Sequence, residues 1–538
     1  MAERAPADFQ EDVQISAIPS SSVTHTPRIF ARWHPDLVAW AVGVLTATLY
    51  ITYNIAQWNA FLVPSWDLGI FTELAQQYAH LNAPIVDIKG PGFNLLGDHF
   101  HPLLFVLGPL FRLFPSGLTL LILQSLLFGW SAVPITRYGR TKLGALWGTL
   151  AGVAYATSWG LAEAVSAQFH EIAFAVPLLA FGLVAWLEGH HRRGAILLGL
   201  LVFVKEDLGL TVAMFGLLLL WTAWGHTSAR MEVEQSAQTA QPGSTRPGGA
   251  IVPFPLRSWK SLRRTIMEHS STPGLAFITW GVFWFVAATM IILPLLNPHG
   301  TWDYTNNVGE TEQTVGGMLG FFINLLGPGQ KIVTVGLLIF ALGVAGLASP
   351  LWWLMLPTLA WRFAGNVQYY WGWEWHYSAV LMPIATLALI DGVLRIKARP
   401  RLRESWRKKV SAAAVSIALV SSLAMFFTAG PMENLVRGQV TTSSARSEGA
   451  RGALAAVGTG RIVVSDLTLL AYLVPGNTVY WSGSVGEAQV DTIVRSPDHS
   501  EDDLTLDSTV WAHEKYGGQW TEVYSEWGFE VLMKNGTF

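Results

Sequence analysis

Long apolar runs alternate with short polar segments over most of the chain. Several approach the about 20 residues that a helix needs to cross a hydrocarbon core of about 30 Å. The pattern therefore predicts a mostly α, polytopic membrane protein with about eleven transmembrane helices. The predicted spans cover residues 37–62, 118–135, 143–159, 172–187, 195–204, 208–224, 275–296, 332–348, 351–363, 377–393 and 410–427. A further apolar run, 103–114, is too short to span and predicts an interfacial or re-entrant helix.

Composition supports this interpretation. Hydrophobic residues make up 51% of the chain and charged residues 13%, whereas a soluble domain carries about 25% charged residues. The chain has no cysteine, which excludes disulfides, thiolate catalysis, zinc–thiolate sites and iron–sulfur clusters. The first apolar run has no small-residue cleavage site, so we expect it to remain as a transmembrane helix rather than a cleaved signal peptide.

The basic residues between the spans predict an orientation. They form clusters that alternate with acid- and histidine-rich segments, and the clusters are Arg28 and Arg32, Arg137, Arg140 and Lys142, His190–Arg193, and residues 395–409. Basic loops stay in the cytoplasm. We therefore expect a multi-pass protein of the bacterial plasma membrane, with a cytoplasmic N-terminus and an extracytoplasmic C-terminal domain.

The runs and breaks divide the chain into five parts. They are a disordered cytoplasmic tail (1–35), an N-terminal transmembrane module (36–225) with an external loop (63–102), a Gly/Pro/Ser-rich cytoplasmic linker (226–272), a C-terminal transmembrane module (273–429) and an external domain (430–538). The last part contains β-branched stretches at 460–465 and 478–481, a helical stretch at 467–473 and a final strand at 527–533. A small α/β domain is predicted, with an acidic loop at 498–507.

The external loop carries the leading candidates for chemistry. Asp67 follows the first span and could accept a proton from a substrate hydroxyl, or it could serve as an N-cap for the next helix. Asp98, His99 and His101 precede the interfacial helix. Their types and spacing allow a divalent metal site or a phosphate site, and Asp98 could equally cap that helix or pair with Arg112. No other cofactor is indicated.

Further charged groups fall at the same predicted level of the membrane. Charges in such positions usually face a cavity or a partner. The candidate substrate-binding residues are His99, His101, His170, Glu171, Lys205, Glu206, Asp207, Arg362, Glu374, His376 and Tyr377. Lys205 could contact a phosphate or form an internal salt bridge. The Trp and Tyr residues around Glu374 are typical of an interfacial belt.

Five short motifs resemble those of a family of bacterial polytopic membrane proteins of unknown function. The motifs are WDLGIF (66–71), LGDHFHP (96–102), QFHE (168–171), VKED (204–207) and HYSA (376–379). The resemblance covers about residues 40–225 and 350–480. His101 departs from it, because a small polar residue is expected there, and this weakens a metal role for His101.

That family in turn resembles the GT-C superfamily of membrane glycosyltransferases. The resemblance implies transfer of a hexosyl or pentosyl group from a polyprenyl-phosphate donor to an extracytoplasmic cell-envelope acceptor. It implies Asp67 as the base, with Asp98 as second choice, and Lys205, Arg362 or a histidine facing the leaving phosphate.

Two other classes stay open on the sequence. One is a transporter or flippase for a lipid-linked or small polar substrate, which would place charges near the bilayer midplane and contain repeated halves. The other is a non-catalytic assembly protein of the envelope. The charges gather towards one face and no repeat is evident, which favours the enzyme. Nothing in the composition indicates nucleic-acid binding, and the lipid bilayer is an expected partner.

Overall fold

The computed structural model describes residues 36–63, 66–239, 271–302, 327–428, 430, 432–438, 440, 444–496 and 507–536. The predicted tail 1–35, most of the linker 226–272, residues 303–326 and nearly all of the acidic loop 498–507 lie outside these residues. The compact unit Leu37–Phe538 contains all the helices and strands named below.

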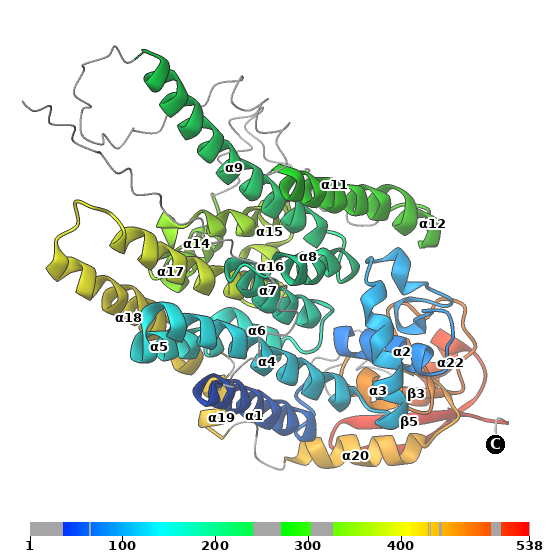
Figure 1. The fold of residues 1–538 in the computed structure, drawn as a ribbon. Helices are drawn as coiled ribbons and strands as arrows, with labels where there is room; N and C mark the ends of the chain where they lie inside the picture. Colours follow the sequence, from blue (N-terminus) through cyan, green and yellow to red (C-terminus); the bar gives the residue numbers. More distant parts are fainter. Residues whose placement is uncertain are drawn as a thin grey trace, which may run out of the picture. The chain divides into compact units, whose positions relative to one another are not determined.

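The first half of the chain is helical, as the apolar pattern predicts (Figure 1). Its helices are α1 (Leu37–Asn59), α2 (Trp66–Ala79), α3 (Leu107–Leu113), α4 (Gly117–Leu143), α5 (Ala145–Ala156), α6 (Trp159–Ser166), α7 (Ile172–Leu187), α8 (His191–Gly199) and α9 (Leu208–Thr239). Helix α1 packs along α4, and α4 also contacts α5 and α7. Helix α9 continues past residue 225, where the linker is predicted to begin.

The second half adds further helices and a small sheet. The helices are α11 (Thr272–Ala287), α12 (Leu293–Leu296), α14 (Gly329–Ala341), α15 (Leu356–Ala364), α16 (Gln368–Trp371), α17 (Leu381–Lys397), α18 (Glu404–Thr428), α19 (Met432–Val436), α20 (Ala445–Val457), α21 (Leu470–Leu473) and α22 (Ser508–Tyr516). Helix α11 packs along α9, and α17 contacts both α18 and α4.

Fewer helices are full-length spans than the about eleven predicted. Five helices of the described residues are long and apolar enough to cross a membrane, and a sixth is counted if the bent pair Gln368–Ser378 and Leu381–Lys397 forms one span. The difference arises because several predicted spans are short or broken. The run 195–204 becomes α8 followed by a 3₁₀ turn, Leu200–Phe203, and the run 351–363 becomes a 3₁₀ segment followed by α15.

Small residues allow the first two spans to approach closely. A methyl group added at Gly43 of α1 would lie 2.7 Å from the carbonyl oxygen of Gly129 in α4, and one added at Gly129 would lie 2.5 Å from the Gly43 oxygen. Between membrane helices such contacts replace the hydrophobic driving force that acts in water. The α1–α4 pair therefore depends on these two glycines.

The C-terminal α/β domain is confirmed. Its strands are β1 (Ile462–Ser465), β2 (Thr478–Trp481), β3 (Thr492–Arg495), β4 (Trp520–Glu526) and β5 (Phe529–Lys534), in the order β2-β1-β3-β5-β4. Strand β1 is parallel to β2 and β3, whereas β5 is antiparallel to β3 and β4. Helix α20 packs on β4 and β5, and α21 packs on α2.

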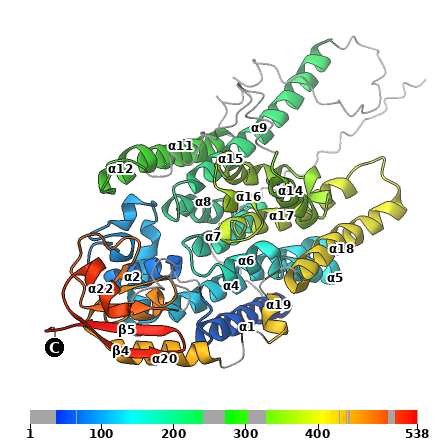
Figure 2. The ribbon, with the colours of Figure 1, turned by 180° about the vertical axis from the view of Figure 1, so that it is seen from behind.

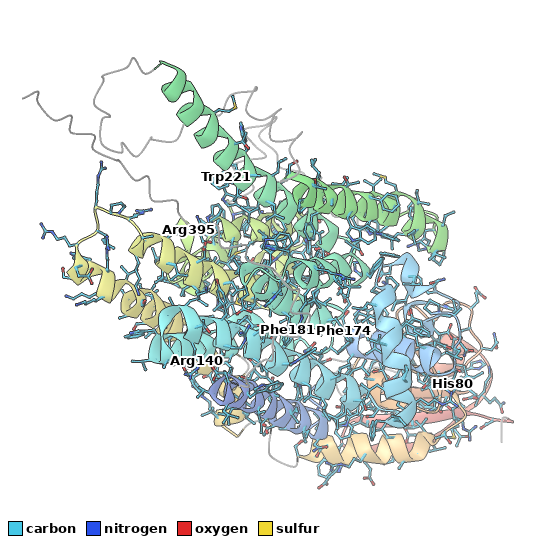
Figure 3. All side chains as sticks on the ribbon, viewed as in Figure 1. His80, Arg140, Phe174, Phe181, Trp221 and Arg395 are labelled. Carbon is cyan, nitrogen blue, oxygen red and sulfur yellow. The ribbon has the colours of Figure 1, made fainter. Side chains whose placement is uncertain are left out.

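The sheet and α2 lie together at one end of the helices in both views (Figures 1 and 2). Arg140 and Arg395, from two of the basic clusters, lie at the other end, while His80, which follows α2, lies at the end that carries the sheet (Figure 3). Aromatic and polar contacts join the sheet domain to the end of α1. Tyr472 stacks on Trp58 at 3.8 Å between ring centroids and donates a hydrogen bond to the Trp58 carbonyl oxygen at 2.9 Å.

Replacing Gly129 with Leu should separate α1 from α4 and lower the melting temperature of the detergent-solubilised protein, because overpacking a close contact costs at least about 1–3 kcal/mol. Gly336 is the matched control, since a methyl group there would meet nothing within 4 Å. Gly336→Leu should leave the melting temperature nearly unchanged. Equal effects of the two substitutions would contradict a special role for the α1–α4 contact.

Candidate functional site

Asp67 lies in the first turn of α2, one residue after the helix begins. Its place is therefore not the N-cap position, although a carboxylate in the first turn still favours the helix dipole. Its Oδ2 atom is 3.2 Å from His170 Nε2, and its side chain is 42% exposed whereas that of His170 is 4% exposed. Asp67 is thus an accessible carboxylate that pairs with a buried histidine.

His170 is held in place on three sides. Its backbone N–H donates to Gln124 Oε1 at 3.3 Å, and its Nδ1 lies 3.1 Å from the Gln168 carbonyl oxygen. Its ring stacks on that of His376, with centroids 3.5 Å apart. Burial alone would lower the pKa of His170, but the carboxylates of Asp67 and Glu171 raise it above its ordinary value. The histidine is therefore biased towards the cation that pairs with Asp67.

Glu171 and Lys205 form a buried ion pair next to His170. Lys205 Nζ donates to Glu171 Oε1 at 2.7 Å, and the two side chains are 11% and 2% exposed. Burial by itself would raise the pKa of Glu171, but the positive charge of Lys205 holds it well below its ordinary value. This pair connects the segment before α7 to the segment before α9.

The next residue along the chain, Glu206, reaches the loop that precedes α3. Its Oε1 lies 2.8 Å from His99 Nδ1, and its Oε2 accepts a hydrogen bond from the Phe100 backbone N–H at 2.9 Å. Burial and the charge of Lys205 both act to lower the pKa of His99, but the Glu206 carboxylate outweighs them, so the pKa lies above its ordinary value. Because Glu206 uses both oxygens, it fixes the position of the LGDHFHP motif.

The other members of this motif differ in their surroundings. Asp98 pairs with Lys89 at 2.7 Å, a partner not singled out in the sequence. His101 is 1% exposed, and no hydrogen-bond partner for its Nδ1 occurs among the described residues. Burial lowers the pKa of His101 to about 4, so this histidine is neutral. Asp207 accepts a hydrogen bond from the Trp361 indole at 2.9 Å.

All five motifs are thus joined by direct contacts. We call the set Asp67, His99, His170, Glu171, Lys205, Glu206 and His376 the five-motif cluster. Its members come from α2, the loop after it, the segments before α7 and α9, and the 3₁₀ turn His376–Ser378. Segments up to about 300 residues apart meet here. The sequence predicted that these charged residues lie at the same depth of the membrane, but not that they contact one another.

Three further candidates, Arg362, Tyr377 and Glu374, belong to the part of the chain around His376, and the Tyr377 ring contacts the His376 ring with centroids 4.1 Å apart. Arg362 is fully buried and donates to the carbonyl oxygens of Tyr370 and Gly372 and to Ser378 Oγ, at 2.8, 2.6 and 3.0 Å. It therefore holds the segment that carries His376. Tyr377 packs edge-on against the ring of Tyr370, and Glu374 is exposed. Their contact with a substrate stays a prediction.

The metal interpretation of Asp98, His99 and His101 lacks a suitable geometry. No group of three or more His, Asp or Glu side chains in the described part of the chain could hold a metal ion. The physical reason is that Asp98 is engaged by Lys89 and His99 by Glu206. These two ligand groups are occupied by ion pairs.

The sequence did not identify Glu73 as a site residue, because an acid at this place in an amphipathic helix is normally exposed. It is buried, and its two oxygens accept hydrogen bonds from the backbone N–H groups of Asp87 and Ile88, each at 3.1 Å. Burial raises its pKa to about 8. The Glu73 carboxyl group connects α2, which carries Asp67, to the loop that leads to Asp98. It therefore helps to position both Asp67 and Asp98.

The residues from 29 to 528 match a family model described as "Predicted membrane protein (DUF2079)". The chain belongs to this family. The family predicted from the five motifs is thereby confirmed, and the protein is a membrane protein. No curated protein matches the chain.

Several solved structures resemble the fold at a distance. ArnT from Cupriavidus metallidurans bound to undecaprenyl phosphate is 12% identical, with 91% of this chain and 98% of that chain covered and a TM-score of 0.44. Arabinofuranosyltransferase AftD from Mycobacteria is 14% identical, with 91% and 39% covered and a TM-score of 0.42. The Archaeoglobus fulgidus oligosaccharyltransferase tethered with an acceptor peptide is 12% identical, with 87% and 70% covered and a TM-score of 0.40. Likenesses this distant identify neither a substrate nor a reacting residue.

Replacing Lys205 with Met should destabilise the protein by about 3–5 kcal/mol, because Glu171 would remain buried without its cation. Removing both charges in Lys205→Met with Glu171→Gln should restore part of the melting temperature. The control is Arg395→Met, which breaks a half-exposed pair with Asp391 and should cost at most about 1 kcal/mol. A double variant no more stable than Lys205→Met would contradict the pairing.

His101 should make the protein sensitive to acid. Its folded pKa of about 4 lies below the value of 6.5 expected when unfolded, so stability is present above pH 6.5 and is lost as the pH falls towards 4. His101→Gln should therefore lose less melting temperature between pH 7 and pH 5 than the parent protein does. The exposed His80 is the control, and His80→Gln should keep the parent's pH dependence.

Proposed function

We propose that this protein is a GT-C-type glycosyltransferase that transfers a sugar from a polyprenyl-phosphate donor to an extracytoplasmic acceptor of the cell envelope. The observation that carries the proposal is the Asp67–His170 pair, an accessible carboxylate held by a buried histidine at the edge of the five-motif cluster. The motif resemblance to GT-C enzymes, with an acid in the first external loop as base, supports the same role for Asp67.

The proposed reaction is an inverting displacement at the anomeric carbon. The acceptor hydroxyl oxygen forms the new bond to this carbon, its proton passes to the Asp67 carboxylate, and the bond between the anomeric carbon and the phosphate oxygen breaks. Polyprenyl phosphate leaves. Lys205 donates one N–H group to Glu171, and in our proposal another of its three N–H groups stabilises the negative charge of the departing phosphate.

The distribution of charge supports the proposed orientation. Arg140 and Arg395 lie at the end of the helices away from α2 and the C-terminal sheet (Figure 3). Basic residues remain on the cytoplasmic side of a plasma membrane. In our proposal, Asp67 and the C-terminal domain therefore face outward, the side on which envelope acceptors occur.

Asp67→Asn should lower transfer about 10²–10⁴-fold, the range expected for loss of a general base. The assay uses the purified full-length protein in vesicles with radiolabelled polyprenyl-phosphate sugars and an envelope extract as acceptor, and the anomeric configuration of the product should be opposite to that of the donor. Glu404, an exposed acid at the start of α18, provides the control. Glu404→Gln should keep full activity.

Melting temperatures of the three proteins separate a lost base from a lost fold. If Asp67→Asn folds normally and still transfers sugar at the parent's rate, Asp67 is not the base. If the parent transfers none of the donors, and cells carrying Asp67→Asn have unchanged envelope glycans, the enzyme proposal is wrong and an assembly role takes its place.

A further inference from the structure

The C-terminal domain has a pocket of its own, separate from the five-motif cluster. Its volume is about 800 Å³, within the range of cavities that hold a small organic ligand. The wall includes the last residue of each parallel strand, Ser465 of β1, Trp481 of β2 and Arg495 of β3, together with residues that follow them. The pocket therefore opens at the carboxyl edge of the parallel part of the sheet.

The strand order makes this edge a natural binding position. Strand β1 lies between β2 and β3, so the chain leaves β1 towards one side for β2 and crosses to the other side for β3. In open α/β sheets, ligands bind outside the carboxyl ends of the strands where the direction of the connections reverses. The pocket lies at such a point.

The lining combines aromatic rings with positive charge. Trp481, Trp511 and Tyr516 supply the rings, and Arg446, Arg495 and Lys515 supply the cations. The Arg495 guanidinium lies 4.7 Å from the Trp511 ring centroid and Lys515 Nζ lies 5.0 Å from it. Two acids oppose the three cations: Asp466 in the lining and Glu530, which pairs with Arg495 at 3.2 Å. Among the described residues that line the pocket or pair with its lining, cations thus outnumber acids, which favours an anion.

Asp466 does not compete for that anion as a free charge. Its Oδ1 accepts a hydrogen bond from the Thr468 backbone N–H at 3.0 Å, and its Oδ2 accepts one from the Ser496 backbone N–H at 2.5 Å. The carboxylate is thus used to fix the loops after β1 and β3. Its role is to shape the pocket.

Ser465 provides an independent sign of a ligand. The residue is 1% exposed and lines the pocket, and its Oγ has no hydrogen-bond partner among the described residues. A buried hydroxyl left unpaired costs free energy of about 1–3 kcal/mol. A ligand hydroxyl or anionic oxygen at the end of β1 would satisfy it.

The local sequence disfavours a nucleotide. Strand β1 runs into Asp466-Leu467-Thr468, with none of the glycines that let a backbone approach a pyrophosphate. Helix α21, which follows, has four residues and is too short to provide an anion site at its N-terminus. Recognition must come from side chains, and these are flat rings, cations and one hydroxyl.

We propose that this pocket binds an anionic saccharide, a sugar ring that carries a carboxylate or a phosphate. The rings of Trp481, Trp511 and Tyr516 offer flat apolar surfaces for the face of the sugar. Arg446 and Lys515 attract its negative group, and Ser465 Oγ exchanges a hydrogen bond with it. The proposal stands on the pocket alone and does not depend on glycosyl transfer.

The pocket is close to the start of α2. Trp481 contacts Trp66, with ring centroids 4.7 Å apart, and Trp66 immediately precedes Asp67. Phe61 and Leu62, just after α1, complete the wall, and Arg446 Nε donates to the Phe61 carbonyl oxygen at 3.3 Å. A saccharide in the pocket would therefore touch the end of the α1 segment and Trp481, which itself contacts the residue before Asp67.

Isothermal titration calorimetry of the full-length protein in detergent tests the proposal by measuring the dissociation constants of four probes. The probes are glucose 1-phosphate, glucuronate, glucose and inorganic phosphate. At least one of the two anionic sugars should bind with a dissociation constant of about 1 mM or lower. Glucose and inorganic phosphate should each bind at least about 10-fold more weakly. Binding should also survive Asp67→Asn, which separates this pocket from the proposed catalytic base.

Substitutions in the wall then locate the site. Lys515→Ala should weaken binding of the anionic sugar about 10-fold, the effect of about 1.4 kcal/mol, and Ser465→Ala about 3-fold. Lys534→Ala, which removes a lysine of the same domain outside the lining, should change it less than 2-fold. Melting temperatures check that each variant folds.

Three results would overturn the proposal. One is no saturable binding of either anionic sugar at about 10 mM. The second is equal affinity for glucose or for inorganic phosphate, which would leave a neutral sugar site or a simple anion site. The third is equal weakening by Lys515→Ala and Lys534→Ala, because binding would then follow the general charge of the domain.

Discussion

The buried ion pair between Glu171 and Lys205 is the interaction on which the rest of the site depends. A charge removed from water beside a membrane is tolerated only when an opposite charge meets it, and here acids and bases alternate from Asp67 through His170, Glu171 and Lys205 to Glu206 and His99. Three ion pairs form in this series: Asp67 with His170, Glu171 with Lys205, and Glu206 with His99. The α2, α7 and α9 regions are held together by this alternation, and Asp67 is its accessible member.

Much of the fold was predictable because apolar runs leave few alternatives in a membrane. The helical architecture and the C-terminal α/β domain follow from period and composition alone. The number of full spans did not, since a run such as 195–204 is apolar enough to suggest a crossing, while its break into α8 and a 3₁₀ turn depends on tertiary contacts. Strands β3 and β4 were missed as well. Strand β3 is short and has no aromatic residue, whereas β4 is mostly polar. The polar face of β4 is exposed, so its apolar positions are few.

The sequence predicted which residues belong to the candidate site, but it did not predict which of them pair with one another. Buried acids and histidines at one level of the membrane are conspicuous in a chain with so few charges. Which acid meets which base is a property of the fold, as Glu206 shows by reaching His99 across 107 positions. Glu73 and Lys89 were overlooked because a single charged residue on a helix or in a loop is ordinary until its burial is known.

The stacking of Tyr472 on Trp58 has a consequence for the synthesis of the protein. These residues are 414 positions apart, and a ribosome adds about 5–20 residues per second. The end of α1 and the α2 segment therefore wait roughly 20–80 s for the domain that covers them. Throughout that interval Trp58 and the face of α2 that packs on α21 lack these contacts. The contacts of the C-terminal domain with α1 and α2 therefore form late in the synthesis of the chain.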